Sequence, residues 1–221
     1  MQEAMPEAMK ASVEQLLQEN PACLWRARET GSSTAAAVPA GLPTGYAALD
    51  RCLPGAGWPR QGLIEILADQ RGIGELRLLL PALAALCRDD GAAGGGWVAW
   101  VSPPFRPYAP SLAAWGIDVG RMLIVNGAGT TEWAMDQALR SESCSAVLGW
   151  ANPRDPHALR RLQLAAETSR SLAVLYRPLQ AGLTPSPAVL RLALLGGGTA
   201  GLQVRIVKSR GGRPVTVNLG H

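Results

Sequence analysis

The sequence predicts an α/β fold with a mostly parallel β-sheet flanked by helices and an antiparallel β extension at its C-terminal edge. Two observations support this fold class. Between residues 62 and 176, short apolar runs alternate with segments of helical periodicity, which is the pattern of consecutive βαβ units. From about residue 190, three apolar runs follow one another with no helix between them, which is typical of antiparallel strands.

The parallel part of the sheet is expected to alternate with helices along the chain. Its strands are expected at residues 62–68, 97–101, 121–125, 146–150 and 172–176. The helices are expected at residues 75–88, 111–115, 131–141 and 156–169. Pro81 should kink the first of these helices, because proline removes a backbone donor. The extension is expected to consist of strands at residues 190–194, 202–208 and 215–219.

The first 40 residues are expected to form a helical arm and a flexible linker. Residues 9–19 suit a short amphipathic helix, whereas residues 31–43 are small, contain proline and show no periodicity. We therefore expect the α/β domain to cover residues 41–221, with a basic β extension that begins near residue 190.

The composition is that of one folded domain. Of the 221 residues, 48% are hydrophobic and 17% are charged, which is too apolar for a disordered chain. The strongest apolar helical run, residues 78–87, falls short of the roughly 18 residues that a membrane span needs. Glu3 and Glu7 precede any apolar stretch, the reverse of a signal peptide. We expect a cytoplasmic protein that makes no membrane contact.

The sequence gives little support for metal, disulfide or hydrolase chemistry. Its four cysteines lie far apart without a C-x-x-C pair, and it has two histidines. No G-x-S-x-G sequence is present. We therefore expect no metal, no cofactor and no catalytic residue.

Positive charge is concentrated in the last third of the chain. Residues 1–40 hold three basic and five acidic side chains, and residues 41–150 hold eight and ten. Residues 151–221 hold ten basic and two acidic side chains, a net charge of +8. This asymmetry indicates a polyanion or an acidic protein surface as the partner of that region.

The segment after the first strand lies where a phosphate-binding loop would lie. A working loop needs G-x-x-x-x-G-K-[ST], since its amides, lysine and hydroxyl hold phosphates and Mg²⁺. Here the loop has Ala68, Arg71, Gly72 and Gly74, but no lysine or hydroxyl in the required places. Glu75 stands in the first turn of the expected helix, where a carboxylate satisfies the helix dipole and repels an incoming phosphate.

The second half of a nucleotide site is also missing. The strand at residues 146–150 ends in Gly149 and Trp150, where a Walker B strand would end in aspartate, and Asp155 comes too late to replace it. We interpret the loop as a degenerate nucleotide site on a scaffold that has lost hydrolysis. Weak nucleotide binding remains an alternative, because fold and activity separate easily.

Several segments resemble the ImuA family, whose members are RecA-like and related to SulA. The sequence TGYAALD at residues 44–50 looks like the entry to a RecA core. GIGELRLLLP at residues 72–81, RRLQLAAE at residues 160–167 and KSRGG at residues 208–212 resemble ImuA itself. The resemblance runs from about Trp25 to the C-terminus and implies a RecA-like fold.

The resemblance also implies a non-catalytic role in the SOS response. ImuA proteins act with ImuB, an inactive relative of Y-family polymerases, and with a DnaE-type error-prone polymerase in translesion DNA synthesis. RecA is a further candidate partner. Two alternatives remain open, namely a SulA-type inhibitor of cell division that binds FtsZ and a weakly nucleotide-binding regulator of RecA.

Basic residues near the C-terminus are candidates for partner or DNA binding. Arg205 and Lys208 are expected to leave opposite faces of their strand, while Arg210 and Arg213 flank the following turn. Such a cluster suits phosphate backbone or an acidic protein, although charge that protects an edge strand explains it equally well.

Tryptophan is the commonest aromatic residue, with seven copies against one phenylalanine. Trp97, Trp100 and Trp150 lie in apolar strands and are expected in the core. Trp25 and Trp58 flank segments rich in glycine and proline, so they are candidates for docking contacts. For Trp25, packing of the arm on its own domain is an alternative.

Overall fold

The computed structural model describes residues 40–69, 72, 74–88, 96–127, 129–196, 201–210, 212 and 214–220. All of these residues belong to one unit, Val38–His221. The arm and linker expected over residues 1–40 lie outside the described residues except for Ala40, so that domain division stays a prediction.

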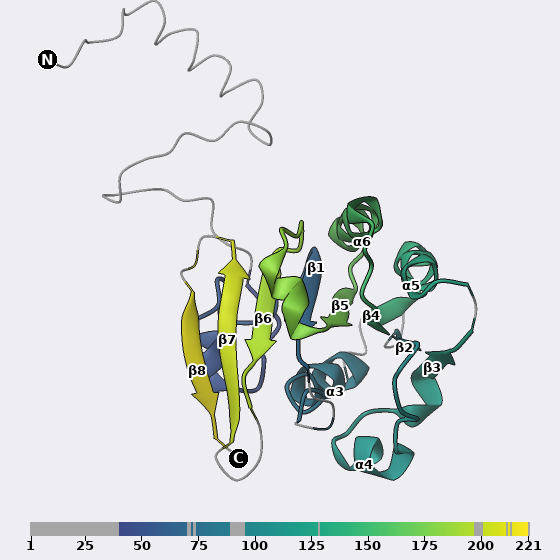
Figure 1. Ribbon diagram of the computed structural model, residues 1–221. Coiled ribbons are helices and arrows are strands. Elements are labelled where there is room, and N and C mark those ends of the chain that lie inside the picture. Colours follow the sequence, from purple (N-terminus) through teal and green to yellow (C-terminus); the bar gives the residue numbers. More distant parts are fainter. Residues whose placement is uncertain are drawn as a thin grey trace, which may run out of the picture. The chain divides into compact units, whose positions relative to one another are not determined.

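An eight-stranded sheet runs through the described part of the chain in the order β3-β2-β4-β5-β1-β6-β7-β8 (Figure 1). Its strands are β1 (Leu63–Leu67), β2 (Trp97–Val101), β3 (Met122–Val125), β4 (Cys144–Trp150), β5 (Leu172–Arg177), β6 (Leu190–Leu194), β7 (Leu202–Ser209) and β8 (Val215–Leu219). β1 to β6 pair in parallel, whereas β7 pairs antiparallel with both β6 and β8. The predicted mixed sheet, mostly parallel with an antiparallel C-terminal extension, is confirmed.

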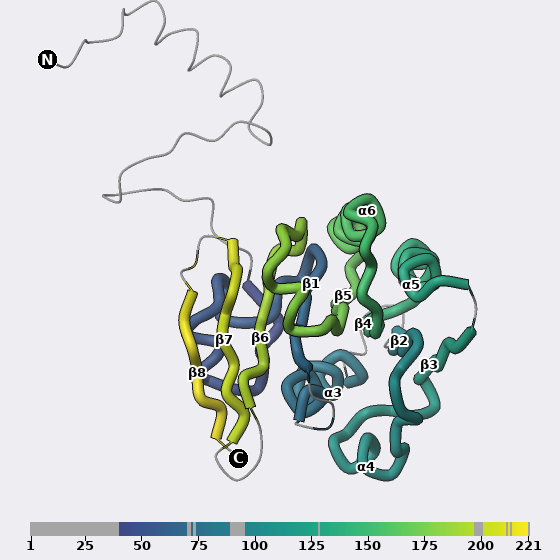
Figure 2. The backbone as a smooth tube through the Cα atoms, viewed as in Figure 1, coloured from purple at the N-terminus to yellow at the C-terminus, as the bar shows by residue number. Residues whose placement is uncertain are grey.

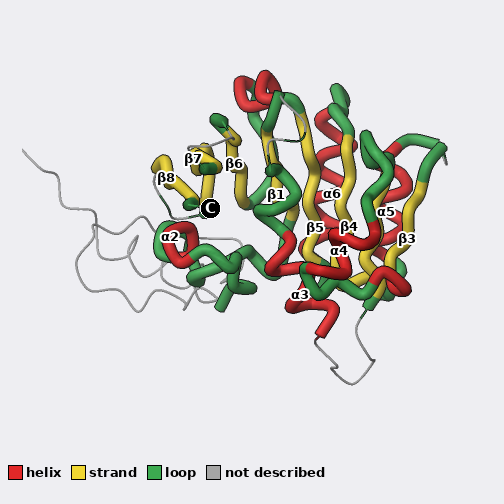
Figure 3. The backbone as a smooth tube through the Cα atoms, turned by 90° about the horizontal axis from the view of Figure 1, so that it is seen from below, coloured by secondary structure: helices red, strands yellow, loops and turns green. Residues whose placement is uncertain are grey.

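Helices cover both faces of the parallel strands (Figures 1 and 3). They are α2 (Ala47–Asp50), α3 (Leu80–Arg88), α4 (Ala109–Ala114), α5 (Thr131–Arg140) and α6 (Pro156–Thr168), with short 3-10 helices η1 (Val119–Arg121) and η2 (Leu179–Leu183). α3 and α4 pack on one face, and α5 and α6 on the other. The backbone trace in Figure 2 places β3 and β8 at opposite edges of the sheet.

β1 lies inside the sheet and is buried at every position. Ile64 and Ile66 contribute to the core on the α3 side, whereas Leu63 belongs to the core on the α6 side. A strand buried on both faces reads as a continuous apolar run, and this explains why the strand was predictable. Glu65 interrupts the run and is buried with it.

Local polar contacts fix the starts of the helices. The Thr130 side chain accepts a hydrogen bond from the Trp133 amide, and Asp155 accepts one from the His157 amide, so each caps the helix that follows. The helix predicted at residues 75–88 begins five residues later, at Leu80, after a series of turns. Pro81 is therefore the second residue of α3 and lies in the first helical turn. It causes no loss of a helical hydrogen bond there, so the expected interior kink is wrong.

Two of the tryptophan predictions are wrong. Trp97 is 46% exposed, because it is the first residue of β2 and lies before the point, Val98, at which β2 begins to pair with the edge strand β3. Trp58 is fully buried, since its backbone forms an antiparallel bridge with Leu42 and its ring joins the core on the α3 side. It is therefore a core residue and not a docking contact.

Candidate functional site

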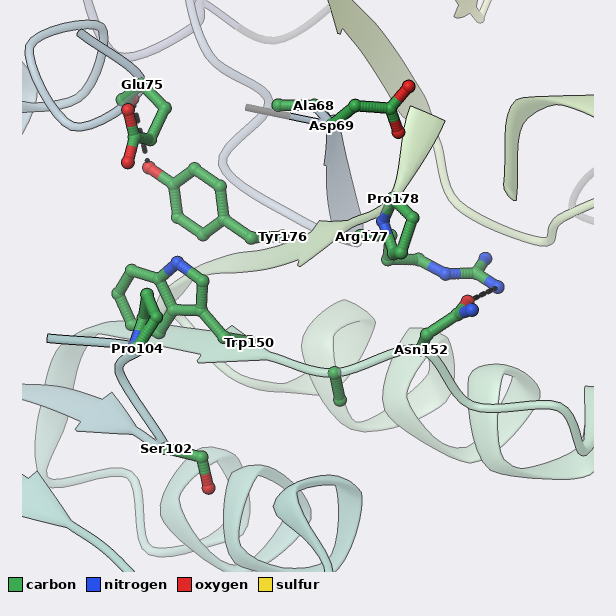
Figure 4. Close-up of a pocket in the computed structure, with 11 residues that line it drawn as sticks. Ala68, Asp69, Glu75, Ser102, Pro104, Trp150, Asn152, Tyr176, Arg177 and Pro178 are labelled. Carbon is green, nitrogen blue, oxygen red and sulfur yellow. Dashed lines mark hydrogen bonds between the residues drawn. The ribbon is translucent and has the colours of Figure 1, made fainter. Parts of the chain in front are cut away.

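The carboxyl ends of four strands surround a cavity of about 310 Å³ (Figure 4). It is lined by residues from the ends of β1, β2, β4 and β5 and from the loops that follow them: Ala68, Asp69, Glu75, Ser102, Pro104, Trp150, Ala151, Asn152, Tyr176, Arg177 and Pro178. In open α/β sheets, ligands bind at the carboxyl ends of the strands. The position of this cavity makes it the candidate site.

Two stacked aromatic rings, Trp150 and Tyr176, line the cavity, and the buried ring of Trp100 stacks on Trp150. The Trp100 and Trp150 ring centroids lie 5.6 Å apart, and those of Trp150 and Tyr176 lie 4.8 Å apart with nearly parallel planes. Trp150 and Tyr176 are register partners on β4 and β5, so the pleat of the sheet sets their stacking. The Tyr176 hydroxyl donates a hydrogen bond to the Glu75 carbonyl oxygen at 3.2 Å, and this contact ties the stack to the loop after β1.

The loop after β1 contains a carboxylate, that of Glu75, which binds a backbone amide of the same loop. Oε1 of Glu75 accepts a hydrogen bond from the Gly72 amide at 3.0 Å, and Gly72 and Gly74 both have positive φ. Oε2 of Glu75 is buried and has no hydrogen-bond partner among the described residues. Ala68 begins the loop, with its amide bonded to the Arg177 carbonyl. The loop therefore brings Ala68, Gly72, Gly74 and Glu75 to the cavity region, while Arg71 lies outside the described residues.

Burial has a clear electrostatic effect at Tyr176. Desolvation of the buried phenol, followed by the negative charge of Glu75, raises the pKa of Tyr176 well above its ordinary value of 10.0. The hydroxyl therefore stays protonated and keeps its hydrogen bond to the loop across the physiological pH range.

A buried charge cluster lies next to the cavity. Oε1 of Glu65 accepts from Nη1 of Arg177 at 2.9 Å, and Oε2 accepts from Nε of Arg191 at 2.7 Å. The Ser186 hydroxyl adds a 2.7 Å hydrogen bond to Oε1. These side chains come from β1, β5 and β6 and from the segment before β6, so the cluster joins three neighbouring strands on one face of the sheet.

The remaining Nη donors of the two arginines bind loop oxygens. Nη2 of Arg177 donates to Oδ1 of Asn152 at 3.1 Å, while Arg191 donates to the carbonyls of Ala181 and Thr184 at 2.7 and 2.9 Å. Nε of Arg177 is buried and has no partner in the part of the chain that the structure describes. Sequence reasoning missed this cluster. The available signal was a single charged residue inside each of three apolar strands.

The basic strand β7 differs from the prediction in one respect. Arg205 lies opposite Ala193, and Lys208 lies opposite Arg191, with an irregularity in the pairing between Arg191 and Leu192. This β-bulge inserts one residue into β7 and resets the alternation of side chains. Arg205 and Lys208 therefore lie on the same face of the sheet, and the prediction of opposite faces is wrong.

Lys208 contacts the surroundings of the buried cluster. Its Nζ donates to the Ser186 carbonyl at 2.8 Å. Partial burial and the charge of Arg191 lower the pKa of Lys208, an effect that the charge of Glu65 partly offsets. Arg205 and Arg210 are exposed, and Nη2 of Arg210 lies 3.9 Å from Oε1 of Glu167. Trp25 and Arg213 lie outside the described residues.

The described residues contain neither a metal-binding cluster nor a membrane-spanning helix. No group of three histidine, cysteine, aspartate or glutamate side chains there could hold a metal ion. Within the same residues, no helix has the length and apolar character required to cross a membrane.

The fold and the site define a mixed α/β protein with a distinctive loop after β1. In this loop the Glu75 carboxylate accepts a hydrogen bond from the backbone amide of Gly72. Over 122 residues the chain is 32% identical to the cell division inhibitor SulA of Edwardsiella piscicida, covering 54% of this chain and 70% of that protein. Over 145 residues it is 30% identical to the protein ImuA of Caulobacter vibrioides, covering 63% of this chain and 57% of that protein. The chain belongs to the SulA-related family that includes ImuA.

The crystal structure of SulA from Pseudomonas aeruginosa matches with a TM-score of 0.41 and 23% identity, over 52% of this chain and 97% of that one. No family model matches the sequence.

Proposed function

We propose that this chain is a non-catalytic accessory protein of the SOS response that supports mutagenic translesion DNA synthesis by protein–protein contacts. Its partners would be an ImuB-like inactive polymerase, a DnaE-type polymerase and RecA. The observation that carries this proposal is the similarity to ImuA, which extends over 63% of the chain. The mostly parallel sheet is compatible with a RecA-like core, which we propose for residues 41–221.

The geometry of the loop supports a non-catalytic role. The Gly72 amide, which would face a phosphate in a working loop, donates to Oε1 of Glu75. A nucleotide would have to displace this carboxylate and would meet its negative charge. Trp150 fills the end of β4, where a metal-binding aspartate would be needed. We therefore propose a degenerate nucleotide site at Ala68, Arg71, Gly72, Gly74 and Glu75.

The proposed partner surface is the basic face of β7. Arg205, Lys208 and Arg210 come from this strand and the turn after it, and Arg213 follows in the sequence. The excess of basic over acidic residues after residue 150 favours an acidic protein surface, and it also permits non-specific contact with DNA. Trp25 is a further candidate for partner contact.

A second candidate function is inhibition of cell division. The similarity to SulA of Edwardsiella piscicida is 32% and covers 70% of that protein, which supports this alternative as strongly as the ImuA match supports the first. In this case the partner would be FtsZ. A third alternative, weak nucleotide binding by a RecA regulator, requires that the Glu75 carboxylate move away from the Gly72 amide.

The test is affinity purification of the tagged full chain from cells after DNA damage, with partners identified by mass spectrometry. Recovery of polymerase subunits is expected. The double variant Arg205→Glu/Arg210→Glu should lose them, because it reverses charge without removing the buried residues of β7. The variant Arg51→Glu/Arg106→Glu is the matched control, since it reverses two exposed arginines elsewhere.

Other outcomes separate the alternatives. Recovery of FtsZ without polymerase subunits, together with inhibition of FtsZ assembly by the purified chain, would overturn the proposal in favour of the division inhibitor. Hydrolysis of ATP by the purified chain, lost in Arg71→Ala, would contradict the non-catalytic assignment.

A further inference from the structure

We propose that the cavity at the carboxyl ends of β1, β2, β4 and β5 binds a guanidinium or ammonium group. The site would take a cationic ligand at the place where a related α/β fold would bind the phosphates of a nucleotide. This inference goes beyond the proposed function, because it holds for an arginine side chain of a partner protein and for a small free amine.

The first argument is a carboxylate oxygen of Glu75 that lacks a hydrogen-bond donor among the described residues. Glu75 is 8% exposed and lines the cavity, and its Oε1 already accepts from the Gly72 amide. Its Oε2 is buried and finds no hydrogen-bond donor within the residues that the structure describes. A buried charged acceptor without a donor is unfavourable, and a ligand that brings N–H groups would relieve this cost. Figure 4 shows the Glu75 carboxylate beside the Tyr176 hydroxyl, on the same side of the cavity as Trp150.

The second argument is the balance of charge around the cavity. Among the described residues that line it, Asp69 and Glu75 are acidic, and Arg177 is the one basic residue. The Arg177 guanidinium is paired with Glu65 at 2.9 Å and reaches toward Asn152, away from Glu75 (Figure 4). Its charge is therefore already compensated, and the remaining field of the two carboxylates attracts cations and repels phosphates.

The third argument concerns the wall of the cavity. The stacked rings of Trp150 and Tyr176 present an apolar surface next to Glu75. Such a surface excludes water and strengthens the attraction between a carboxylate and an organic cation. A divalent metal fits less well, because it needs more oxygen ligands than two carboxylates supply, and the described residues hold no group of three potential ligands.

The experiment is isothermal titration of the purified full chain with agmatine, which carries both a guanidinium and an ammonium group. We expect saturable binding at one site that ATP does not displace. Glu75→Gln should weaken binding roughly tenfold or more, since it removes the charge but keeps an acceptor for the Gly72 amide. Glu142→Gln, at an exposed position away from the cavity, should leave the affinity unchanged. The thermal midpoint of each variant shows whether it is folded.

A second arm uses the peptide acetyl-Gly-Arg-Gly-amide. Tighter binding of this peptide than of agmatine would identify a partner's arginine as the ligand, whereas the reverse would identify a small amine. The proposal is overturned if neither probe binds, if folded Glu75→Gln binds as tightly as the unaltered chain, or if ATP displaces agmatine. These results are independent of which partner the chain has in cells, so failure here leaves the proposed function standing.

Discussion

Replacement of Glu65 by glutamine should destabilise the protein strongly. The change keeps the shape of the side chain but removes the negative charge between two guanidinium groups, whose nitrogens lie 2.9 and 2.7 Å from its oxygens. Glu65, Arg177 and Arg191 are all buried, so water cannot compensate the two remaining cations. Loss of one partner from a buried ion pair costs about 3–5 kcal/mol.

Urea unfolding, monitored by far-ultraviolet circular dichroism, measures the loss in the free energy of unfolding. Thermal unfolding gives a second readout. For a domain of this length, 1 kcal/mol corresponds to a shift in melting temperature of roughly 2–4 °C, so a loss of about 3–5 kcal/mol lowers the melting temperature by about 6–20 °C. The control is Arg140→Gln. This side chain is 59% exposed and pairs with Asp136 on the surface of α5, so the unfolding midpoint should not change.

A triple variant tests whether charge is the cause. In Glu65→Leu/Arg177→Met/Arg191→Leu, all three charges are replaced by apolar side chains, and such replacements of buried ion clusters are often neutral. Part of the loss should remain, because the carbonyls of Ala181 and Thr184 lose the donors that Arg191 provides. The reasoning is refuted if Glu65→Gln costs less than about 1 kcal/mol, or if the triple variant is less stable than the single one.

Three further predictions concern other sites. The pKa of Tyr176 is higher in the folded than in the unfolded state, so the buried phenol contributes its full stability below pH 10 and loses it as the pH rises through the folded-state pKa. The urea midpoint of the unaltered chain should therefore fall at alkaline pH, and Tyr176→Phe should make this fall shallower. An unchanged fall in the variant would contradict the argument. Burial raises the pKa of the Cys144 thiol, so iodoacetamide should modify Cys144 more slowly than the half-buried Cys87, as measured by peptide mass spectrometry; equal rates would count against it. Gly57→Ala should cost about 1–3 kcal/mol in urea unfolding, since a Cβ atom there would collide with the Leu42 carbonyl, and a neutral result would show that this bridge is adaptable.

The strands and most helices were predictable because their apolar patterns are local. A parallel strand buried on both faces reads as a continuous apolar run, and helices that cover it show one apolar stripe. The start of α3 was not predictable to the residue, because residues 75–79, whose pattern of leucines between charged residues suits a helix, form turns instead. The four-residue α2 was also missed, since one helical turn leaves almost no periodic signal.

Features that depend on pairing between distant strands were not predictable. The bulge that places Arg205 and Lys208 on one face arises from the register between β6 and β7, and no local pattern reveals it. The same reason applies to tryptophan. Burial of Trp58 follows from its bridge to Leu42, and exposure of Trp97 follows from its place at the start of β2, before the pairing with β3 begins.

The candidate site was predictable in part. The sequence predicts Glu75 in the first turn of a helix, and this is wrong, because α3 begins at Leu80 and Glu75 lies in the turns before it. The anion that Glu75 adds to the loop was predictable, and its carboxylate accepts a hydrogen bond from the Gly72 amide. The sequence did not reveal that Oε2 lacks a partner, nor that Trp150 and Tyr176 form the wall beside it. These properties depend on how β4 and β5 are aligned. The interpretation of the loop as a degenerate nucleotide site stays a prediction.

The arrangement of charge in the sheet connects these features. The one carboxylate on the inner part of β1, Glu65, is used by two arginines, so the positive charge of Arg177 is not available to a phosphate in the cavity. On the other side of the cavity, Oε1 of Glu75 accepts the hydrogen bond of the Gly72 amide, while its Oε2 has no partner among the described residues. A fold that binds phosphate needs free amides and an uncompensated cation at this place. Here the amide of Gly72 and the cation of Arg177 are both engaged by carboxylates. Under the two proposals made above, loss of nucleotide binding and preference for a cation would have a common origin in Glu65 and Glu75, since each of these carboxylates engages a group that an anion would need.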